Sequence, residues 1–262
     1  MQASESTAIA PPPTGEYPFR EAADIETSSD RYARRFAGPT GRWMLAVQED
    51  RTRSLLRPYG PGRSILDVGG GHGQLAVPFC REGHRVTVLG SAPECSARIR
   101  DIIVSGSCRF CVGDVISLPF PDRSFDLAIS FRLLTHCSRW PDLVAELCRV
   151  ARQAVIVDYP TSQSVNRLAP KLFAAKKKLE GDTRTWKLFT HAEVREVFAD
   201  LGFRERRRYK QFFLPMVAHR MLKCRPLSAG LEALARAAGL TRLAGSPVIA
   251  CYEPAGNGKR TR

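Results

Sequence analysis

The stretch ILDVGGGHGQLAV, from Ile65 to Val77, constrains the fold more than any other part of the chain. It opens with a short apolar run, which is typical of a buried parallel strand. Four glycines follow within five residues, and a segment with apolar residues on one helical face comes next. A strand, a glycine turn and a helix in that order predict a nucleotide-type pocket at the carboxyl end of the strand.

Asp67 lies two residues before the first glycine of this turn. Glycines let the backbone turn sharply and approach a ligand that a side chain would exclude. A carboxylate at this position can meet a cationic or hydroxylated part of that ligand. The structural alternative is an ordinary glycine-rich turn in an α/β domain, because such a motif alone is a weak signal.

The next strand helps to choose between cofactors. Gly71, Gly73 and Ala76 also fit the dinucleotide fingerprint, which expects an acid at the end of the following strand when the ligand is NAD. That strand, residues 85–89, ends instead in Gly90 and Ser91. An NAD site is therefore disfavoured.

A second block, GDVISLPFPDRSFDLAIS at residues 113–130, decides the assignment. With the first block, in this order and spacing, it resembles the class I S-adenosylmethionine (SAM)-dependent methyltransferases, specifically the type 11 group that contains quinone C-methyltransferases. The resemblance covers about residues 60 to 160. It implies an α/β, Rossmann-like sheet of seven strands in the order 3-2-1-4-5-7-6, with strand 7 antiparallel, helices on both faces and helical lid insertions.

The expected elements follow this plan. Strands are predicted at 64–68, 85–89, 108–112, 125–130, 154–158, from 203 onward and at 247–252. Helices are predicted at 72–82, at 91–104 behind a Ser91/Glu94 capping box, at 140–150, and behind a Thr190/Glu193 cap. An N-terminal helical region at 30–56 is broken at Gly38 and Pro39.

This plan divides the chain into four parts. We expect a disordered tail at 1–16, N-terminal cap helices at 17–60, a SAM-binding domain at 61–254 and a basic tail at 255–262. Two helical insertions, at about 161–188 and 212–244, are expected to close over a small ligand on the substrate side of the sheet.

The resemblance also implies a set of cofactor-binding residues. At the Gly-Asp position, Asp114 contacts the adenine amino group in the family, and the next backbone amide reaches a ring nitrogen. The full set is Tyr32, Asp67, Gly69, Gly71, His72, Gly73, Ser91, Asp114, Val115, Phe131 and Arg132.

One position departs from the family. An acid normally ends the second strand and bridges the ribose hydroxyls, and Gly90 stands there in this chain. Losing that acceptor weakens binding by about 1–3 kcal/mol. Ser91, or an acid from another loop such as Glu94, is the expected substitute.

Methyl transfer from a sulfonium proceeds by direct displacement and needs no metal. The protein must align donor and acceptor and, for some oxygen or nitrogen acceptors, remove a proton. The candidate catalytic residues are His136, Asp158 and Tyr159, of which His136 is the best placed, shortly after the fourth strand. A structural or cofactor-lining role is the alternative for each.

Net charge, apolar run length and cysteine content limit the kinds of partner, location and metal site that the chain can have. Forty basic and 26 acidic residues give a net charge of +14, which permits contact with nucleic acid or anionic lipid. A solvated basic surface is favoured, because no nucleic-acid-binding module accompanies the charge.

No apolar run approaches the ~20 residues of a membrane span, and a cytoplasmic location is expected. The eight cysteines indicate buried reduced thiols and no metal site.

The sequence therefore predicts a SAM-dependent methyltransferase that acts on a small molecule in specialised metabolism and releases S-adenosylhomocysteine. O-methylation is favoured over N- or C-methylation. The alternatives are methylation of RNA, protein or lipid, and a non-catalytic scaffold with the same fold. The sequence SFRL at residues 130–133 argues against base N-methylation, and no specific nucleic-acid binding is expected.

Overall fold

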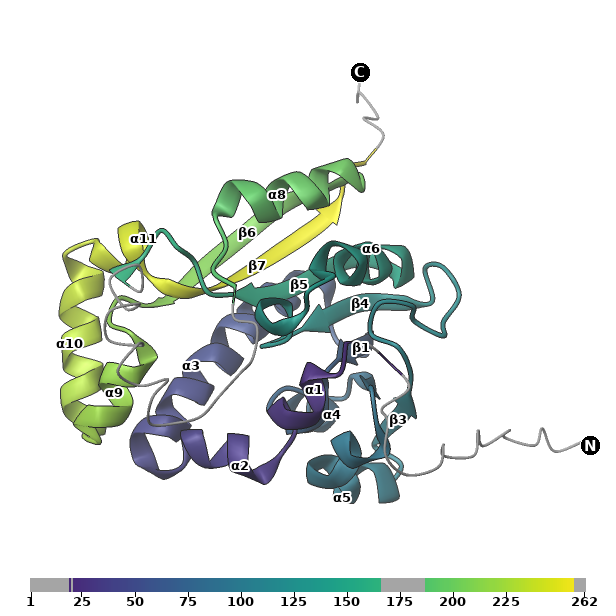
Figure 1. Ribbon diagram of the computed structural model, residues 1–262, viewed down its shortest axis with the longest axis horizontal. Helices are drawn as coiled ribbons and strands as arrows, with labels where there is room; N and C mark the ends of the chain where they lie inside the picture. The colour runs from purple at the N-terminus through teal and green to yellow at the C-terminus, as the bar shows by residue number, and fades with distance from the viewer. Residues whose placement is uncertain (1–18, 20, 166–186, 257–262) are drawn as a thin grey trace, which may run out of the picture.

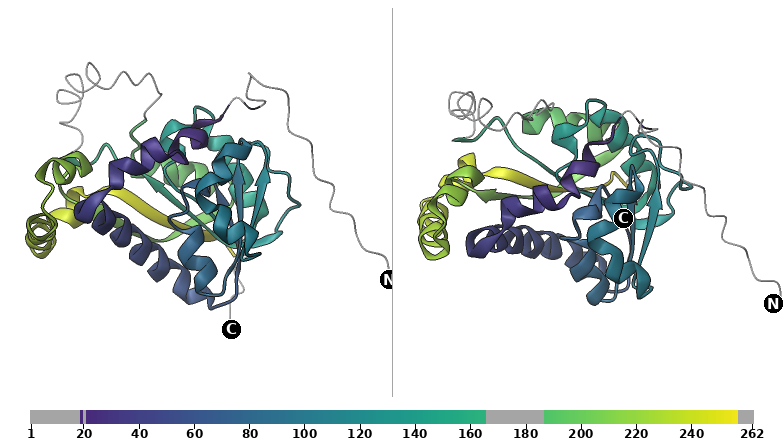
Figure 2. Two further views of the ribbon diagram at one scale, coloured as in Figure 1. Left: turned by 90° about the horizontal axis from the view of Figure 1, so that it is seen from below. Right: turned by 60° about the horizontal axis from the view of Figure 1, so that its bottom comes forward.

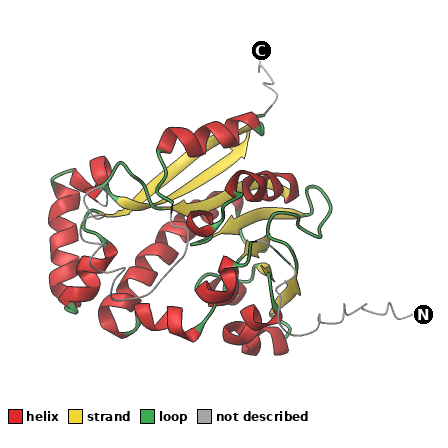
Figure 3. Ribbon diagram, viewed as in Figure 1, coloured by secondary structure: helices red, strands yellow, loops and turns green. Residues whose placement is uncertain are grey.

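The computed structural model describes residues 19, 21–165 and 187–256, which build one seven-stranded sheet with helices on both faces (Figures 1 and 3). Its order is β3-β2-β1-β4-β5-β7-β6, with β7 antiparallel to both of its neighbours. The predicted fold is confirmed. The strands are β1 (Ser64–Val68), β2 (Arg85–Gly90), β3 (Cys108–Val112), β4 (Phe125–Ser130), β5 (Ala151–Tyr159), β6 (Phe203–Phe212) and β7 (Ser246–Pro254).

The helices fall into three groups. An N-terminal group precedes the sheet: α1 (Ala23–Thr27), α2 (Asp30–Ala33), the 3₁₀ turn η1 (Arg34–Phe36), α3 (Gly38–Leu56) and η2 (Arg57–Tyr59). A second group connects the strands: η3 (Gly70–His72), α4 (Ala76–Arg81), η4 (Pro93–Ile99), α5 (Arg100–Val104), η5 (Leu134–His136), α6 (Trp140–Val150) and α8 (His191–Asp200). A third group lies between β6 and β7: α9 (Met216–Leu222), α10 (Arg225–Ala237) and α11 (Leu240–Ala244).

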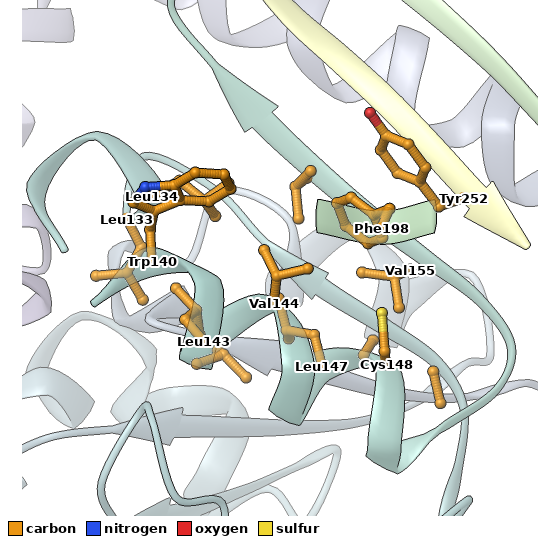
Figure 4. Close-up of a cluster of buried hydrophobic side chains, with 14 of the residues drawn as sticks. Leu133, Leu134, Trp140, Leu143, Val144, Leu147, Cys148, Val155, Phe198 and Tyr252 are labelled. Atoms are coloured by element: carbon orange, nitrogen blue, oxygen red, sulfur yellow. The ribbon is translucent and has the colours of Figure 1, made fainter. Parts of the chain in front are cut away.

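Alternating strand residues divide the core into two layers. On one face α6 and α8 pack on β5 and β7, where the Phe198 ring stacks on Tyr252 at 3.6 Å between centroids (Figure 4). On the other face α3 packs on β6 and β7 and α4 packs on β2, with Phe79 of α4 fully buried. Because successive strand side chains point to opposite faces, neighbours such as Ile65 and Leu66 belong to different layers.

Two predicted helices differ from the structure. The helix predicted at 72–82 is only α4, since the glycine stretch before it forms the 3₁₀ turn η3 and Gly73 takes a left-handed conformation. The capping box predicted at Ser91 and Glu94 is wrong. The segment begins as the 3₁₀ helix η4 behind Ala92, and the Ser91 hydroxyl donates instead to Asp24.

Other local predictions are confirmed. The N-terminal helical region breaks before Gly38, and the Thr190 hydroxyl accepts a hydrogen bond from the Glu193 amide at the start of α8. The helices α9–α11 lie within the range predicted as an insertion, 212–244, and its role as a lid stays a prediction. The insertion predicted at 161–188 lies mostly outside the described residues, as do the tail at 1–16 and most of 255–262. No helix within the described ranges has the length and apolarity needed to cross a membrane.

Candidate functional site

The carboxyl ends of β1 and β4 meet beside a hollow of about 280 Å³, measured to its open mouth. Its floor is the glycine turn that follows β1, and its walls come from α1, η3 and the residues after β4. The hollow is lined by Thr27, Asp67, Gly69, Gly70, His72, Gln74, Leu75, Phe131 and Arg132.

The glycine turn requires its glycines. Gly69 and Gly73 have φ angles of 76° and 78°, a region that other residues rarely adopt. A Cβ atom at Gly70 would overlap the Asp67 carboxyl group. The backbone can therefore pass directly against this carboxyl group and leave the hollow open beside it.

Asp67 is buried at the end of β1, and its Oδ1 has no hydrogen-bond partner among the described residues. Burial raises the pKa of this carboxyl to about 7, and the positive charge of Arg132 opposes that rise. A buried carboxylate oxygen without a partner is costly, which makes it a candidate ligand-binding atom.

Arg132 provides the opposite charge. Its backbone N–H donates to Asp158 and its guanidinium donates to the Gln74 side-chain oxygen. The guanidinium carbon lies 5.2 Å from the ring centroid of Phe36 and 5.9 Å from that of Tyr32. Its Nη1 is buried and finds no hydrogen-bond partner in the described part of the chain.

Asp67 and Arg132 thus give the hollow one unsatisfied acceptor and one unsatisfied donor of opposite charge. This is the complement of an amino-acid zwitterion, whose ammonium donates and whose carboxylate accepts. The methionyl part of SAM carries such a zwitterion. The residues present therefore fit the cofactor that the sequence predicts.

His72 lines the same hollow. Its ring meets Tyr32 and Phe36 edge-on, with centroids 6.1 and 6.0 Å apart. Burial, followed by the charges of Arg132 and Arg98, lowers its pKa to about 3. The imidazole is therefore neutral at physiological pH and a poor proton acceptor.

Sequence reasoning missed Asp24, which comes from α1 and is fully buried. Its Oδ2 accepts from the Ser91 amide at 2.7 Å and its Oδ1 accepts from the Ser91 hydroxyl. A Cβ at Gly90 would lie 2.5 Å from that of Cys95, so Cys95 excludes a side chain there. The end of β2 therefore meets a carboxylate from another element. By contrast, Glu94, the substitute acid that the sequence suggested, is exposed.

The adenine-binding residues implied by the family resemblance lie at the end of β3. The Asp114 carboxylate accepts from the Ile116 amide at 3.0 Å, and Val115 between them is buried. β2 separates this end of the sheet from β1 and its glycine turn. The structure places Asp114 at the sheet edge that the prediction requires, and its role stays a prediction.

The three catalytic candidates are not gathered around the hollow. His136 is half-buried in η5, and Asp158 accepts from Gln48 Nε2 at 2.8 Å and from the Arg132 amide. Burial raises the pKa of Asp158 to about 6. Tyr159 points to the opposite face of the sheet, where its hydroxyl shares a hydrogen bond of 3.2 Å with His191 Nδ1.

The described residues contain no cluster of three or more His, Cys, Asp or Glu side chains that could hold a metal ion. The cysteines among them are free thiols.

Comparison with known proteins finds a family match for part of the chain. Residues 66–157 match the family described as methyltransferase domain. This segment is similar to class I methyltransferase domains of type 11. The match spans β1 to β5, which includes the glycine turn and most of the residues lining the hollow.

Two curated relatives are similar to part of this chain, and one solved structure shares its fold. Malonyl-[acyl-carrier protein] O-methyltransferase of Serratia marcescens is 33% identical over 120 residues, which are 44% of this chain and 46% of that protein. The ubiquinone/menaquinone biosynthesis C-methyltransferase UbiE of Dinoroseobacter shibae is 34% identical over 122 residues, 40% of this chain and 44% of that protein. Magnesium protoporphyrin IX methyltransferase of Synechocystis, solved with bound SAH, shares the fold at a TM-score of 0.62 and 16% identity. That likeness covers 89% of this chain and 97% of that one.

The chain spans about half the length of the curated relatives it matches. The helices α9–α11 lie outside residues 66–157, the segment that matches the family.

We expect Asp67 to make stability pH-dependent. Burial raises the pKa of Asp67 to about 7 in the folded protein, against about 4 in the unfolded chain. The contribution of this carboxyl to the free energy of unfolding is therefore full below about pH 4 and is lost as pH rises through about 7. From about pH 4 to about pH 8, the wild-type free energy of unfolding should therefore fall relative to that of Asp67→Asn. Urea unfolding across this range measures the difference. Parallel curves for the two proteins would contradict the expectation.

Proposed function

We propose that this protein transfers a methyl group from SAM to a small-molecule acceptor. The observation that carries the proposal is the pair of unsatisfied, oppositely charged groups in the hollow, Asp67 Oδ1 and Arg132 Nη1. They lie beside a glycine turn in a class I methyltransferase domain.

In this proposal Asp67 accepts from the ammonium of the cofactor and Arg132 donates to its carboxylate. The glycine turn lets the backbone reach the cofactor, and Asp114 binds the adenine amino group. When bound, SAM supplies an electrophilic methyl on a positively charged sulfur. The chain orients this group toward the acceptor and keeps water away, and the rings of Tyr32 and Phe36 beside Arg132 contribute to that exclusion.

We further propose that Asp24 replaces the missing acid of β2 as the acceptor for the ribose hydroxyls. The Ser91 amide and hydroxyl hold its carboxylate at the carboxyl end of that strand. A carboxylate has about four acceptor sites, so the contacts from Ser91 and Cys95 leave capacity for a hydroxyl. α1 would then bind the cofactor through Asp24 and line its hollow through Thr27.

The acceptor is proposed to be an oxygen that arrives already ionised, such as a carboxylate. Of the described side chains that line the hollow, His72 is too weak a base, and Asp67 is committed to the cofactor. An ionised oxygen needs no base, and the net charge of +14 favours the approach of an anion. The relative from Serratia marcescens is named as an O-methyltransferase, which is consistent with an oxygen acceptor.

The non-catalytic alternative rested on Gly90. It loses its support if Asp24 supplies the carboxylate, because the site is then complete within one chain.

Calorimetric titration tests the cofactor. SAM and S-adenosylhomocysteine should both bind with micromolar affinity, and NADPH should not bind. Asp67→Ala and Arg132→Ala should each weaken binding of S-adenosylhomocysteine by about tenfold or more, because each leaves a cofactor charge unpaired. Binding of NADPH alone would overturn the cofactor assignment.

The role of Asp24 is tested by two single substitutions. Asp24→Asn should weaken binding of S-adenosylhomocysteine by about ten- to a hundredfold, since an amide is a poorer acceptor for two hydroxyls. Glu94→Gln, at the exposed acid of η4, is the matched control and should leave the affinity unchanged. Tighter binding by Asp24→Asn would instead mean that α1 obstructs the cofactor.

The acceptor atom is tested with SAM carrying a labelled methyl group and a pool of small carboxylic acids. A methyl ester releases its label as volatile methanol in mild alkali, whereas an ether, amine or carbon-bound methyl does not. We expect alkali-labile label, and no loss of turnover in His136→Ala beyond about twofold, because no base is required. Alkali-stable label would contradict the proposed acceptor.

A further inference from the structure

The helices α9–α11 form a separate group at one end of the sheet, as all three views show (Figures 1 and 2). α10 contacts α3 and α9 on its inner side and α11 near its end. Its buried residues are Ser228, Glu232 and Ala235, which recur at helical spacing and so define the face that meets the protein.

A second stripe on α10 is partly exposed to solvent. Leu227, Leu231 and Leu234 are spaced four and three residues apart, so they lie on one side of the helix. Their exposed fractions are 48%, 37% and 70%. We call these three residues the leucine stripe. The exposed residues beside it, Gly230 and Ala233, carry no polar side chain.

The neighbouring helices α9 and α11 also expose apolar side chains. Met221 at the end of α9 is 77% exposed and Leu243 of α11 is 72% exposed. Leu222 and Leu240 are also exposed. Single exposed leucines are normal on a soluble protein, but a stripe with further apolar residues on both adjoining helices marks an interaction surface.

The charges around this surface are of one sign. Lys223, Arg225, Arg236 and Arg242 are exposed. Glu232 is the only acid between residues 213 and 245, and it is buried. It pairs with His219 at 3.0 Å and accepts from two backbone amides, so it cancels none of the surface charge.

We propose that α9–α11 dock on the surface of an anionic lipid bilayer, with the leucine stripe inserted at the level of the headgroups. A short helix with exposed leucines and flanking cations lies in the plane of a membrane interface, and each cation near the surface adds about 1 kcal/mol of attraction to anionic lipid. A protein partner fits less well, because protein interfaces rely on aromatic anchors and this surface presents none.

This inference stands apart from the proposed methyl transfer. It uses only the exposure and charge of α9–α11, none of which line the hollow. If it holds, the protein meets its acceptor at a membrane surface without crossing the bilayer.

Co-sedimentation of the full chain with vesicles tests the proposal. Vesicles of phosphatidylcholine with about 30% phosphatidylglycerol should bind the protein about tenfold or more tightly than phosphatidylcholine alone. Leu234→Glu should weaken that binding by about tenfold or more, since it places a charge in the stripe. Leu234→Ala should weaken it less. Leu234 is 70% exposed, so neither substitution should disturb the core, and thermal unfolding verifies that both variants fold.

Val104→Glu is the matched control. Val104 is 82% exposed on α5, at a different end of the sheet, and the substitution adds the same negative charge. It should bind the anionic vesicles as the wild type does. Equal loss in Val104→Glu and Leu234→Glu would show general charge attraction and would overturn the docking surface.

Two further outcomes would also overturn the proposal. The first is absence of binding to either vesicle. The second is a concentration-dependent dimer, detected by light scattering, that Leu234→Glu abolishes. That result would assign the leucine stripe to a second copy of the chain.

Discussion

The unsatisfied polar atoms of Asp67 and Arg132 are the constraint on which the candidate site depends. Each side chain has a polar atom without a hydrogen-bond partner in the described structure, although burial makes such an atom costly. The fold keeps both in place by unrelated means. The end of β1 holds Asp67 against a glycine, and the hydrogen bond from the Arg132 amide to Asp158 fixes the backbone from which the guanidinium reaches the hollow. Two unpaired polar atoms at one location are costly to bury, and a ligand that hydrogen-bonds to both would remove this cost.

At the end of β2, where the chain has a glycine, a carboxylate comes from another element. Cys95 occupies the space beside Gly90, so an acid there would clash with the packing of η4. A carboxylate nevertheless reaches the same strand end from Asp24, about seventy residues earlier in the sequence. The same short segment contributes Thr27 to the hollow. The helix α1 is therefore part of the candidate site.

Much of the architecture is readable from the sequence, because periodicity and glycine placement are local signals. The strand β3 at CRFCV, the helix α6 at 140–150 and the strand order all follow from such patterns and from the family resemblance. The pairing of Asp24 with Ser91 is not readable, since no local pattern links two residues so far apart. The capping box failed for the same reason, because Asp24 takes the Ser91 hydroxyl that the motif would have used. The exposure of the α10 leucines could not be predicted either. Apolar residues at helical spacing indicate a buried face, and here a different face of the helix is buried.

The central claim is that Asp67 and Arg132 hold the amino-acid end of the cofactor. It is tested most directly by comparing S-adenosylhomocysteine with 5′-methylthioadenosine, which keeps the nucleoside and lacks the zwitterion. Calorimetry on Arg132→Ala and Asp67→Asn should show a large loss of affinity for the first ligand and little change for the second. Equal losses for both ligands, or none for either, would contradict the claim.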